Sequence, residues 1–458
     1  MEQVTFIILG ATGDLTKRKI IPAIYRLLKN KKISRLALVG VARKDLNMDS
    51  ILQEAQAFIG KVNKTIWNRL KSSSYYCQLD FYNNQEYQKL GELLQQIEKK
   101  HHLSGNRLFY LATLPEHFDT ITENLFNTKI ARETTGSWRR LVYEKPFGSD
   151  LASAKKINHC ICRVFKENQI FRVDHYLGKE LVGNISMLRF TNRVLEPLWN
   201  SLHVESIQVV MNEKIGIEGR GNFYDKYGAL KDVIQNHVLQ MMALTCMEAP
   251  QRLSGDYIRE EKAKVLKAAQ VKEVLLGQYE GYASEPGVEK ESRRETFAAL
   301  KLRINNRRWK NVPIYLKSGK ELVEKATNIH IIFKKAGCLL NICPTESNVL
   351  TIRVQPNEGF ELNLFAKRPG VPDLAVPVKM DFCHSCITKQ KSPEAYEVLL
   401  SDVIKGDQTL FVRNDEIEYA WKIIDGIRKE KVHSYKKGTT GPEELKLFEQ
   451  KNGMKWLS

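Results

Sequence analysis

The chain has 458 residues, 43% of them hydrophobic, and a formal net charge of +18. This length predicts two domains, and the apolar content is sufficient for globular cores. No apolar run approaches the roughly 18 residues that cross a bilayer, and no secretory leader follows Met1, so we expect a cytoplasmic protein without a membrane partner.

The high positive charge is compatible with three interpretations: a nucleic-acid partner, anionic small-molecule substrates, or a generally basic surface. The lysines and arginines are spread along the chain, without a basic arm or a stripe interleaved with aromatic residues. This distribution favours a generally basic surface, with anionic substrates as the second interpretation. We therefore expect no nucleic-acid partner.

The eight cysteines are scattered, which argues against a disulfide framework in a chain of this length. Cys383-His384-Ser385-Cys386 has the internal spacing of a zinc ligand pair, but no second pair lies at the distance typical of a zinc ribbon or finger. We expect no metal site.

The N-terminal segment has the order strand, glycine turn, helix. Val4–Leu9 is an apolar run that ends at Gly10, and Thr16–Leu28 has a helical pattern. This order opens a dinucleotide-binding fold, in which free amide groups at the helix N-terminus bind a pyrophosphate. The glycine spacing is Gly-x-x-Gly rather than the full three-glycine pattern, so alone it is weak evidence.

A second strand, Arg35–Val41, ends just before Arg43 and Lys44. NAD enzymes usually place an acidic residue at this strand end, where it binds the ribose hydroxyls. A guanidinium instead fits a 2′-phosphate. Arg43 therefore favours NADP, with an ordinary surface arginine as the alternative.

Further strands and helices of the same type follow. We predict strands within Ser74–Phe81, at Leu108–Thr113 and from Leu141 to its end in Glu144-Lys145-Pro146, and helices at Gln85–Lys100 and Lys155–Asn168. Cofactors bind at the carboxyl ends of such strands, where Leu79, Asp80, Tyr110 and Lys145 lie.

The second half of the chain alternates apolar and polar residues, which is typical of half-buried antiparallel strands. Leu300–Asn305, Ile329–Phe333, Leu350–Val354 and Phe360–Leu364 show this pattern, and Ala283–Glu295 is predicted to be an exposed loop.

The stretch from Arg172 to Glu180, Arg-Val-Asp-His-Tyr-Leu-Gly-Lys-Glu, is dense in ionisable side chains. Lys179 lies four residues after His175, and residues four apart share one face of a helix. His175, Tyr176 and Lys179 could then converge on one phosphate. The alternative is an ordinary solvated helix start.

Four segments together resemble the glucose-6-phosphate dehydrogenase family, and the resemblance covers nearly the whole chain. They are the stretch Arg172–Glu180, the loop that begins at Gly10, Glu144-Lys145-Pro146, and Asp232-Val233-Ile234-Gln235-Asn236-His237. The Glu-Lys-Pro element also occurs in other two-domain sugar dehydrogenases.

The resemblance implies an α/β Rossmann-like domain at residues 1–174 and an α+β domain at 175–458 with a large, mainly antiparallel sheet. It implies NADP-dependent oxidation of glucose 6-phosphate at C1 to the lactone, the first step of the oxidative pentose phosphate pathway, in an assembly of at least two copies. His237 would be the general base that takes the sugar hydroxyl proton, oriented by Asp174. By pattern alone His237 is a core histidine.

The same resemblance implies the other site residues. The cofactor-binding set is Gly10, Ala11, Thr12, Gly13, Asp14, Leu15, Thr16, Lys17, Arg43, Leu79, Asp80, Tyr110 and Lys145. The substrate-binding set is Lys145, His175, Tyr176, Lys179, Glu213, Asp232, Lys320, Lys325 and Gln355. Asp232 and His237 lie about 140° apart on an α-helix, so their shared place in one pocket does not follow from spacing.

Two alternatives stay open at this point. Another two-domain sugar oxidoreductase would act on unphosphorylated sugars and would not need Lys179. A non-catalytic relative would retain the pocket and bind nucleic acid through its basic surface, and this binding would weaken as the salt concentration rises.

Overall fold

The computed structural model describes residues 2–338, 346–370, 375–383, 393–428 and 430–457. The chain divides into two compact units, which are treated separately below. The first contains Met1–Gly178, Arg252–Arg259 and Pro393–Glu418, and the second contains Lys179–Gln251, Glu260–Ser392 and Tyr419–Ser458. The predicted boundary after residue 174 lies near the first change of unit, whereas nothing in the sequence indicated the later returns to the first unit.

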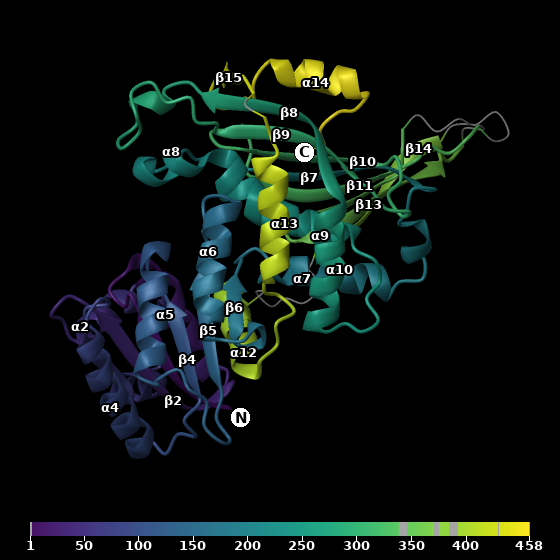
Figure 1. Ribbon diagram of the computed structural model, residues 1–458. Coiled ribbons are helices and arrows are strands. Elements are labelled where there is room, and N and C mark those ends of the chain that lie inside the picture. Colours follow the sequence, from purple (N-terminus) through teal and green to yellow (C-terminus); the bar gives the residue numbers. More distant parts are fainter. Residues whose placement is uncertain (1, 339–345, 371–374, 384–392, 429, 458) are drawn as a thin grey trace. The chain divides into compact units, whose positions relative to one another are not determined.

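The first unit is built on a parallel six-stranded sheet in the order β3-β2-β1-β4-β5-β6 (Figure 1). Its strands are β1 (Glu2–Leu9), β2 (Ile33–Ala42), β3 (Ser74–Gln78), β4 (Arg107–Leu111), β5 (Arg139–Glu144) and β6 (Ile170–Val173). This is the strand order of the doubly wound dinucleotide fold, in which ligands bind outside the carboxyl ends of the strands. The predicted α/β class and each predicted strand of this half are confirmed.

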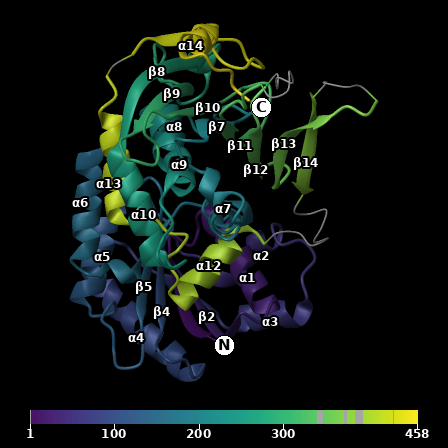
Figure 2. The same ribbon diagram turned by 90° about the vertical axis from the view of Figure 1, so that its right-hand side faces the viewer.

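Helices cover the sheet of the first unit. They are η1 (Thr16–Ile20), α1 (Ile21–Lys29), α2 (Met48–Gln56), α3 (Lys64–Ser72), α4 (Asn84–Lys100), η2 (Pro115–His117), α5 (Phe118–Asn127), α6 (Leu151–Cys162), η3 (Glu167–Gln169) and α12 (Ala395–Lys405). Although α12 comes from the last quarter of the chain, it lies beside α1 (Figure 2). Its buried Leu399, Leu400 and Val403 belong to the same apolar core as β1, so the C-terminal part of the chain completes the N-terminal unit.

The helix predicted at Lys155–Asn168 is displaced. Asp150 accepts a hydrogen bond from the Ser153 amide in a reciprocal capping box, so α6 begins before the predicted start. It ends at Cys162 because the chain then turns to bury Phe165, whose ring lies 6.1 Å from that of Phe109 on β4.

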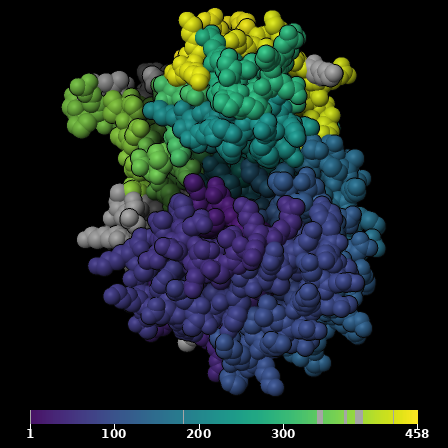
Figure 3. All heavy atoms as spheres, turned by 90° about the vertical axis from the view of Figure 1, so that its left-hand side faces the viewer, coloured from purple at the N-terminus to yellow at the C-terminus, as the bar shows by residue number. Residues whose placement is uncertain are grey.

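The second unit contains a nine-stranded sheet in the order β14-β13-β12-β11-β7-β10-β9-β8-β15. Its strands are β7 (Val204–Asn212), β8 (Ala269–Tyr279), β9 (Phe297–Ile304), β10 (Pro313–Gly319), β11 (Ala326–Phe333), β12 (Val349–Gln355), β13 (Gly359–Lys367), β14 (Ala375–Cys383) and β15 (Val432–Tyr435). Only the pairs β7–β10 and β8–β15 are parallel among these strands. The mainly antiparallel class is therefore confirmed. Strands β13 and β14 project from the rest of this unit (Figures 2 and 3).

The remaining helices are α7 (Glu180–Phe190), η4 (Glu196–Leu198), α8 (Gly221–Ala229), η5 (Leu230–Val238), α9 (Leu239–Cys246), α10 (Gly255–Ala268), η6 (Tyr282–Ser284), α13 (Asn414–Asp425) and α14 (Glu444–Asn452). Two buried indoles fix the end of α9: Trp199 donates to the Thr245 carbonyl at 3.0 Å and Trp309 to the Cys246 carbonyl at 2.7 Å. The segment η5 packs against β7, β9 and β10, so it rests directly on the sheet.

The junction of α8 and η5 is a sharp kink at Gly228, which has φ 66° and ψ −177°. Only glycine adopts this backbone conformation readily. Beyond the kink, the Ala229 amide donates to the Glu295 carbonyl at 3.0 Å and the Leu230 amide donates to the Glu295 side chain at 3.2 Å. Glu295 therefore satisfies both amide groups at the start of η5, one with its backbone carbonyl and the other with its buried carboxylate.

No helix in the described ranges combines the length and apolar character that a membrane span requires. Cys77, Cys160, Cys162 and Cys246 are free thiols. Cys338 and Cys383 are each disulfide-bonded, which the scattered cysteine pattern did not predict. The His384, Ser385 and Cys386 of the candidate zinc motif lie outside the described residues.

We predict that Gly228→Ala lowers the free energy of unfolding by at least about 3 kcal/mol, because the backbone is strained for any L-residue and the added Cβ would lie 2.3 Å from Glu295 Oε1. Gly219→Ala is the matched control, since Gly219 also has positive φ but open space around it; it should cost about 1 kcal/mol. Urea unfolding measures both. Equal losses would show that the contact with Glu295 is unimportant.

Candidate active site

The loop that begins at Gly10 is shaped for close backbone approach. Gly10 has φ +100°, and a Cβ there would lie 2.3 Å from the carbonyl oxygen of Ala112. The Gly13 amide donates back to the Gly10 carbonyl at 3.0 Å, and the Thr16 hydroxyl donates to the same carbonyl at 3.3 Å. Only a glycine fits this cradle, and the chain enters η1 directly after it. The residues present thus fit a dinucleotide pyrophosphate.

The other cofactor candidates of the first unit differ in exposure. Arg43 is exposed just after β2, and its carbonyl accepts a hydrogen bond from Gln78. Lys17 forms an ion pair with Glu54 at 2.6 Å. Asp80 is exposed, whereas the Leu79 side chain is fully buried. Arg43 and Asp80 therefore present their side chains to solvent, and Leu79 can present only its backbone.

Tyr110 and Lys145 lie at the ends of adjacent strands, β4 and β5. The buried Tyr110 hydroxyl donates to Glu144 Oε1 at 2.5 Å. Burial raises the pKa of Glu144 to about 7, although its hydrogen bonds from Tyr110 and Tyr396 oppose the shift. Lys145 follows directly and is half-buried. The strand end therefore carries a protonatable carboxyl beside the predicted nicotinamide-side lysine.

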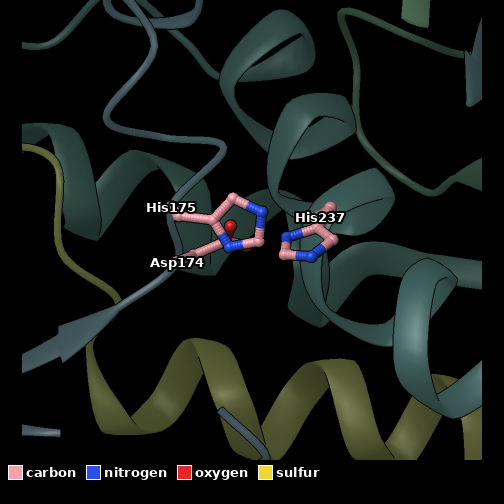
Figure 4. Close-up of side chains that lie close together, drawn as sticks. All are labelled: Asp174, His175 and His237. Atoms are coloured by element: carbon pink, nitrogen blue, oxygen red, sulfur yellow. The ribbon is translucent and has the colours of Figure 1, made fainter. Parts of the chain in front are cut away.

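The stretch Arg172–Glu180 is a strand end and a turn. Arg172 is fully buried and holds Glu167 with two hydrogen bonds of 2.6 and 2.9 Å. Asp174 and His175 lie on the loop that leaves β6 (Figure 4), and Asp174 Oδ1 accepts a hydrogen bond from the Tyr176 amide at 2.9 Å. This bond closes a tight turn.

The expectation that His175 and Lys179 share a helix face is wrong. The helix α7 begins only at Glu180, with Lys179 as its N-cap residue. The turn closed by Asp174 occupies the positions that the first helical turn would have taken.

Asp232 and His237 lie on a π-helix, η5, rather than on an α-helix. Figure 4 shows His237 on this segment. Hydrogen bonds in a π-helix join residues five apart, so positions five apart lie close to one above the other. The Asn236 side chain adds a bond of the same span, to the Lys231 carbonyl at 3.2 Å. Both Asp232 and His237 are buried. The wide angle that would separate Asp232 and His237 on an α-helix is therefore reduced by the π-helical backbone, and the two side chains share a face.

Three of the predicted sugar-site residues meet within the second unit. Lys320 is 2% exposed and pairs with Glu213, and its ammonium lies 5.2 Å from the ring centre of Tyr224. Burial raises the pKa of Tyr224 well above its usual value, and the carboxylates of Asp232, Glu295 and Glu213 contribute. Tyr224 is thus the common neighbour of a cation and three carboxylates.

Strand register places the last two predicted residues at the same end of this sheet. Ala326 lies opposite Asn212 in the antiparallel pair β11–β7, so Lys325 and Glu213 are adjacent just beyond it. Gln355 ends β12 opposite Thr327. Lys325 is exposed and Gln355 is half-buried, which leaves both accessible to a ligand.

Four residues of these clusters were not singled out from the sequence: Glu144, Tyr224, Glu295 and Tyr396. Glu144 had a usable signal, because it adjoins Lys145 in the Glu-Lys-Pro element. The other three had none, since their partners come from distant segments.

Two family models match the chain: "Glucose-6-phosphate dehydrogenase, NAD binding domain" over residues 7–184, and "Glucose-6-phosphate dehydrogenase, C-terminal domain" over 186–457. The glucose-6-phosphate 1-dehydrogenases of Chlamydia pneumoniae and Bacillus subtilis are each 40% identical to it. The alignments cover 98% of this chain and 95% and 97% of those proteins, respectively.

Solved structures give the same result. A glucose-6-phosphate dehydrogenase in complex with its substrate glucose 6-phosphate matches with a TM-score of 0.93 and 33% identity, covering 100% of this chain and 99% of the other. Glucose-6-phosphate 1-dehydrogenase from Mycobacterium avium matches with a TM-score of 0.87 and 34% identity, with the same coverage. The chain therefore belongs to the glucose-6-phosphate dehydrogenase family, as its motifs predicted.

Proposed function

We propose that this protein oxidises D-glucose 6-phosphate at C1 to 6-phosphoglucono-1,5-lactone with NADP, as the first step of the oxidative pentose phosphate pathway. The observation that carries the proposal is full-length similarity to a dehydrogenase solved with glucose 6-phosphate. The cluster of half-buried Glu213 with buried Asp232 and Lys320 supports it, because it offers both donors and acceptors for sugar hydroxyls.

We propose the following division of roles. Gly10–Lys17 and Arg43 hold the dinucleotide, Arg43 by its 2′-phosphate. NADP, when bound, supplies the hydride acceptor at C4 of its nicotinamide. His175, Tyr176 and Lys179 hold the sugar phosphate, and Lys145, Glu213, Asp232, Lys320, Lys325 and Gln355 hold the sugar.

His237 takes the proton of the C1 hydroxyl, and Asp174 orients the imidazole and stabilises the imidazolium that forms. Binding the distant phosphate aligns C1 for reaction, because remote interactions fix the reacting geometry. His237 is buried, which suits it to act as the general base, since the exclusion of water strengthens its hydrogen bonds.

We further propose a homodimer or homotetramer in the cytoplasm that has no nucleic-acid or membrane partner. The absence of a nucleic-acid partner is supported by the spread of basic residues along the sequence, which contains no basic arm or stripe interleaved with aromatic residues.

His237→Asn should lower kcat by roughly 10²–10⁴-fold, because the general base is lost, while glucose 6-phosphate still binds. NADPH absorbance measures turnover and titration calorimetry measures sugar binding. His203→Asn, an exposed histidine of the same unit, is the matched control and should retain full turnover. Near-normal turnover of His237→Asn would rule out its role as the base.

Arg43→Ala should raise the KM for NADP by roughly tenfold or more and leave that for NAD nearly unchanged, because only NADP has the 2′-phosphate. Arg35→Ala removes the same charge from the opposite end of β2 and should leave the ratio of the two KM values unaltered. If Arg43→Ala leaves that ratio unaltered too, Arg43 does not bind the 2′-phosphate.

A further inference from the structure

Lys320 is a buried cation that makes little use of its hydrogen-bonding capacity. The residue is 2% exposed and directly follows β10, which ends at Gly319. Its Nζ forms an ion pair with Glu213 Oε2, and no second hydrogen bond to this ammonium is present among the described residues. A lysine ammonium has three donors, so the others remain for a ligand. One ion pair leaves an ammonium free to swing about its partner, so the position of this one depends on further contacts.

The ring of Tyr224, on α8, supplies such a contact. Lys320 Nζ lies 5.2 Å from the centre of this ring, within the roughly 6 Å at which the negative face of an aromatic ring attracts a cation. The attraction is stronger where water is excluded, and Tyr224 is 1% exposed. The Tyr224 hydroxyl has no hydrogen-bond partner in the described part of the chain. The ring, rather than the hydroxyl, is therefore what Tyr224 offers to Lys320.

The aromatic cluster that contains Tyr224 also holds the backbone of Lys320. The Tyr435 hydroxyl donates to the Lys320 carbonyl at 2.7 Å. Tyr224 and Tyr435 belong to one buried core of the second unit. Edge-to-face ring contacts connect them through two further tyrosines, Tyr282 and Tyr279. The backbone and the ammonium of Lys320 are therefore both held by one group of packed rings.

We propose that Tyr224 is a positioning residue whose ring holds the Lys320 ammonium where its remaining donors reach the sugar. This inference rests on the proposed function, in which Lys320 holds glucose 6-phosphate. Tyr224 acts through Lys320, and its own hydroxyl is dispensable. The ring suits this role because it attracts the charge without adding a second carboxylate, which would compete with the sugar for the donors.

Tyr224→Leu and Tyr224→Phe test the proposal. Tyr224→Leu removes the ring, so the KM for glucose 6-phosphate should rise roughly two- to thirtyfold, the range expected for loss of a cation–π contact. The kcat and the KM for NADP should change little, because a contact made equally before and during reaction affects substrate binding alone. Tyr224→Phe keeps the ring and should retain the wild-type KM. Tyr224→Met, which also lacks a ring, replaces the leucine variant if that variant does not fold.

Phe448→Leu is the matched control for packing. Phe448 is buried in the same core, where its ring contacts Tyr315 and Trp456. A merely structural role for Tyr224 would reduce the amount of active enzyme, and so the apparent kcat, in both leucine variants without raising the KM of either. We expect the KM for glucose 6-phosphate to be unchanged in Phe448→Leu.

Three results would overturn the proposal. In the first, Tyr224→Leu leaves the KM for glucose 6-phosphate unchanged. In the second, Tyr224→Phe raises that KM as much as Tyr224→Leu does, since the hydroxyl would then be the group that matters. In the third, Phe448→Leu raises it equally, since loss of packing would then account for the effect.

A wild-type protein that makes no NADPH from glucose 6-phosphate would contradict the proposed function instead. The hold of the ring on the ammonium is then decided without substrate, from the rate at which an amine-acylating reagent modifies Lys320, measured by mass spectrometry. Faster modification in Tyr224→Leu than in Phe448→Leu supports the positioning role, and an equal or lower rate overturns it.

Discussion

The position of His237 depends on how its helix begins, and one buried carboxylate fixes that start. The Glu295 side chain accepts a hydrogen bond from the Leu230 amide. The kink at Gly228 makes this bond possible, because it brings the backbone close to Glu295. Had the helix started one residue earlier or later, every following side chain would point to a different side of the helix. The anchor at Glu295 thus determines which face of η5 carries Asp232 and His237.

In the first unit, residues from late in the sequence return to cover one edge of the sheet. Its sheet edge at β6 is closed by residues from the last part of the sequence: Val412 forms a bridge with Arg172, and Gln408 donates to the Ile170 carbonyl. Arg172, buried with Glu167, Tyr143 and Asn158 around it, keeps the strand end rigid just before Asp174. A side chain that orients a general base needs such support, because small displacements cost rate.

Much of this fold was predictable from patterns within short segments of sequence. Features that depend on contacts between residues far apart in the sequence were not predictable. The strand, glycine turn and helix at the N-terminus follow from a short apolar run and two glycines, and the period-two strands of the second unit follow from alternation. The π-helix was not predictable, because its register depends on Glu295, 65 residues further along. For the same reason the hydrogen bond between Tyr396 and Glu144 was not predicted, since the two residues are adjacent only after the chain returns to the first unit.

The exposures of Lys320 and Arg43 match the charge of the ligand group that each would bind. Lys320 is buried and already paired with Glu213, so it suits neutral sugar hydroxyls, which bring no charge of their own to compensate a lone ammonium. Arg43 is exposed and suits a phosphate, which carries its own negative charge and is costly to remove from water. The buried, paired Lys320 would therefore recognise the sugar by the fixed geometry of its hydrogen bonds. The exposed Arg43 would recognise the 2′-phosphate of the cofactor by charge.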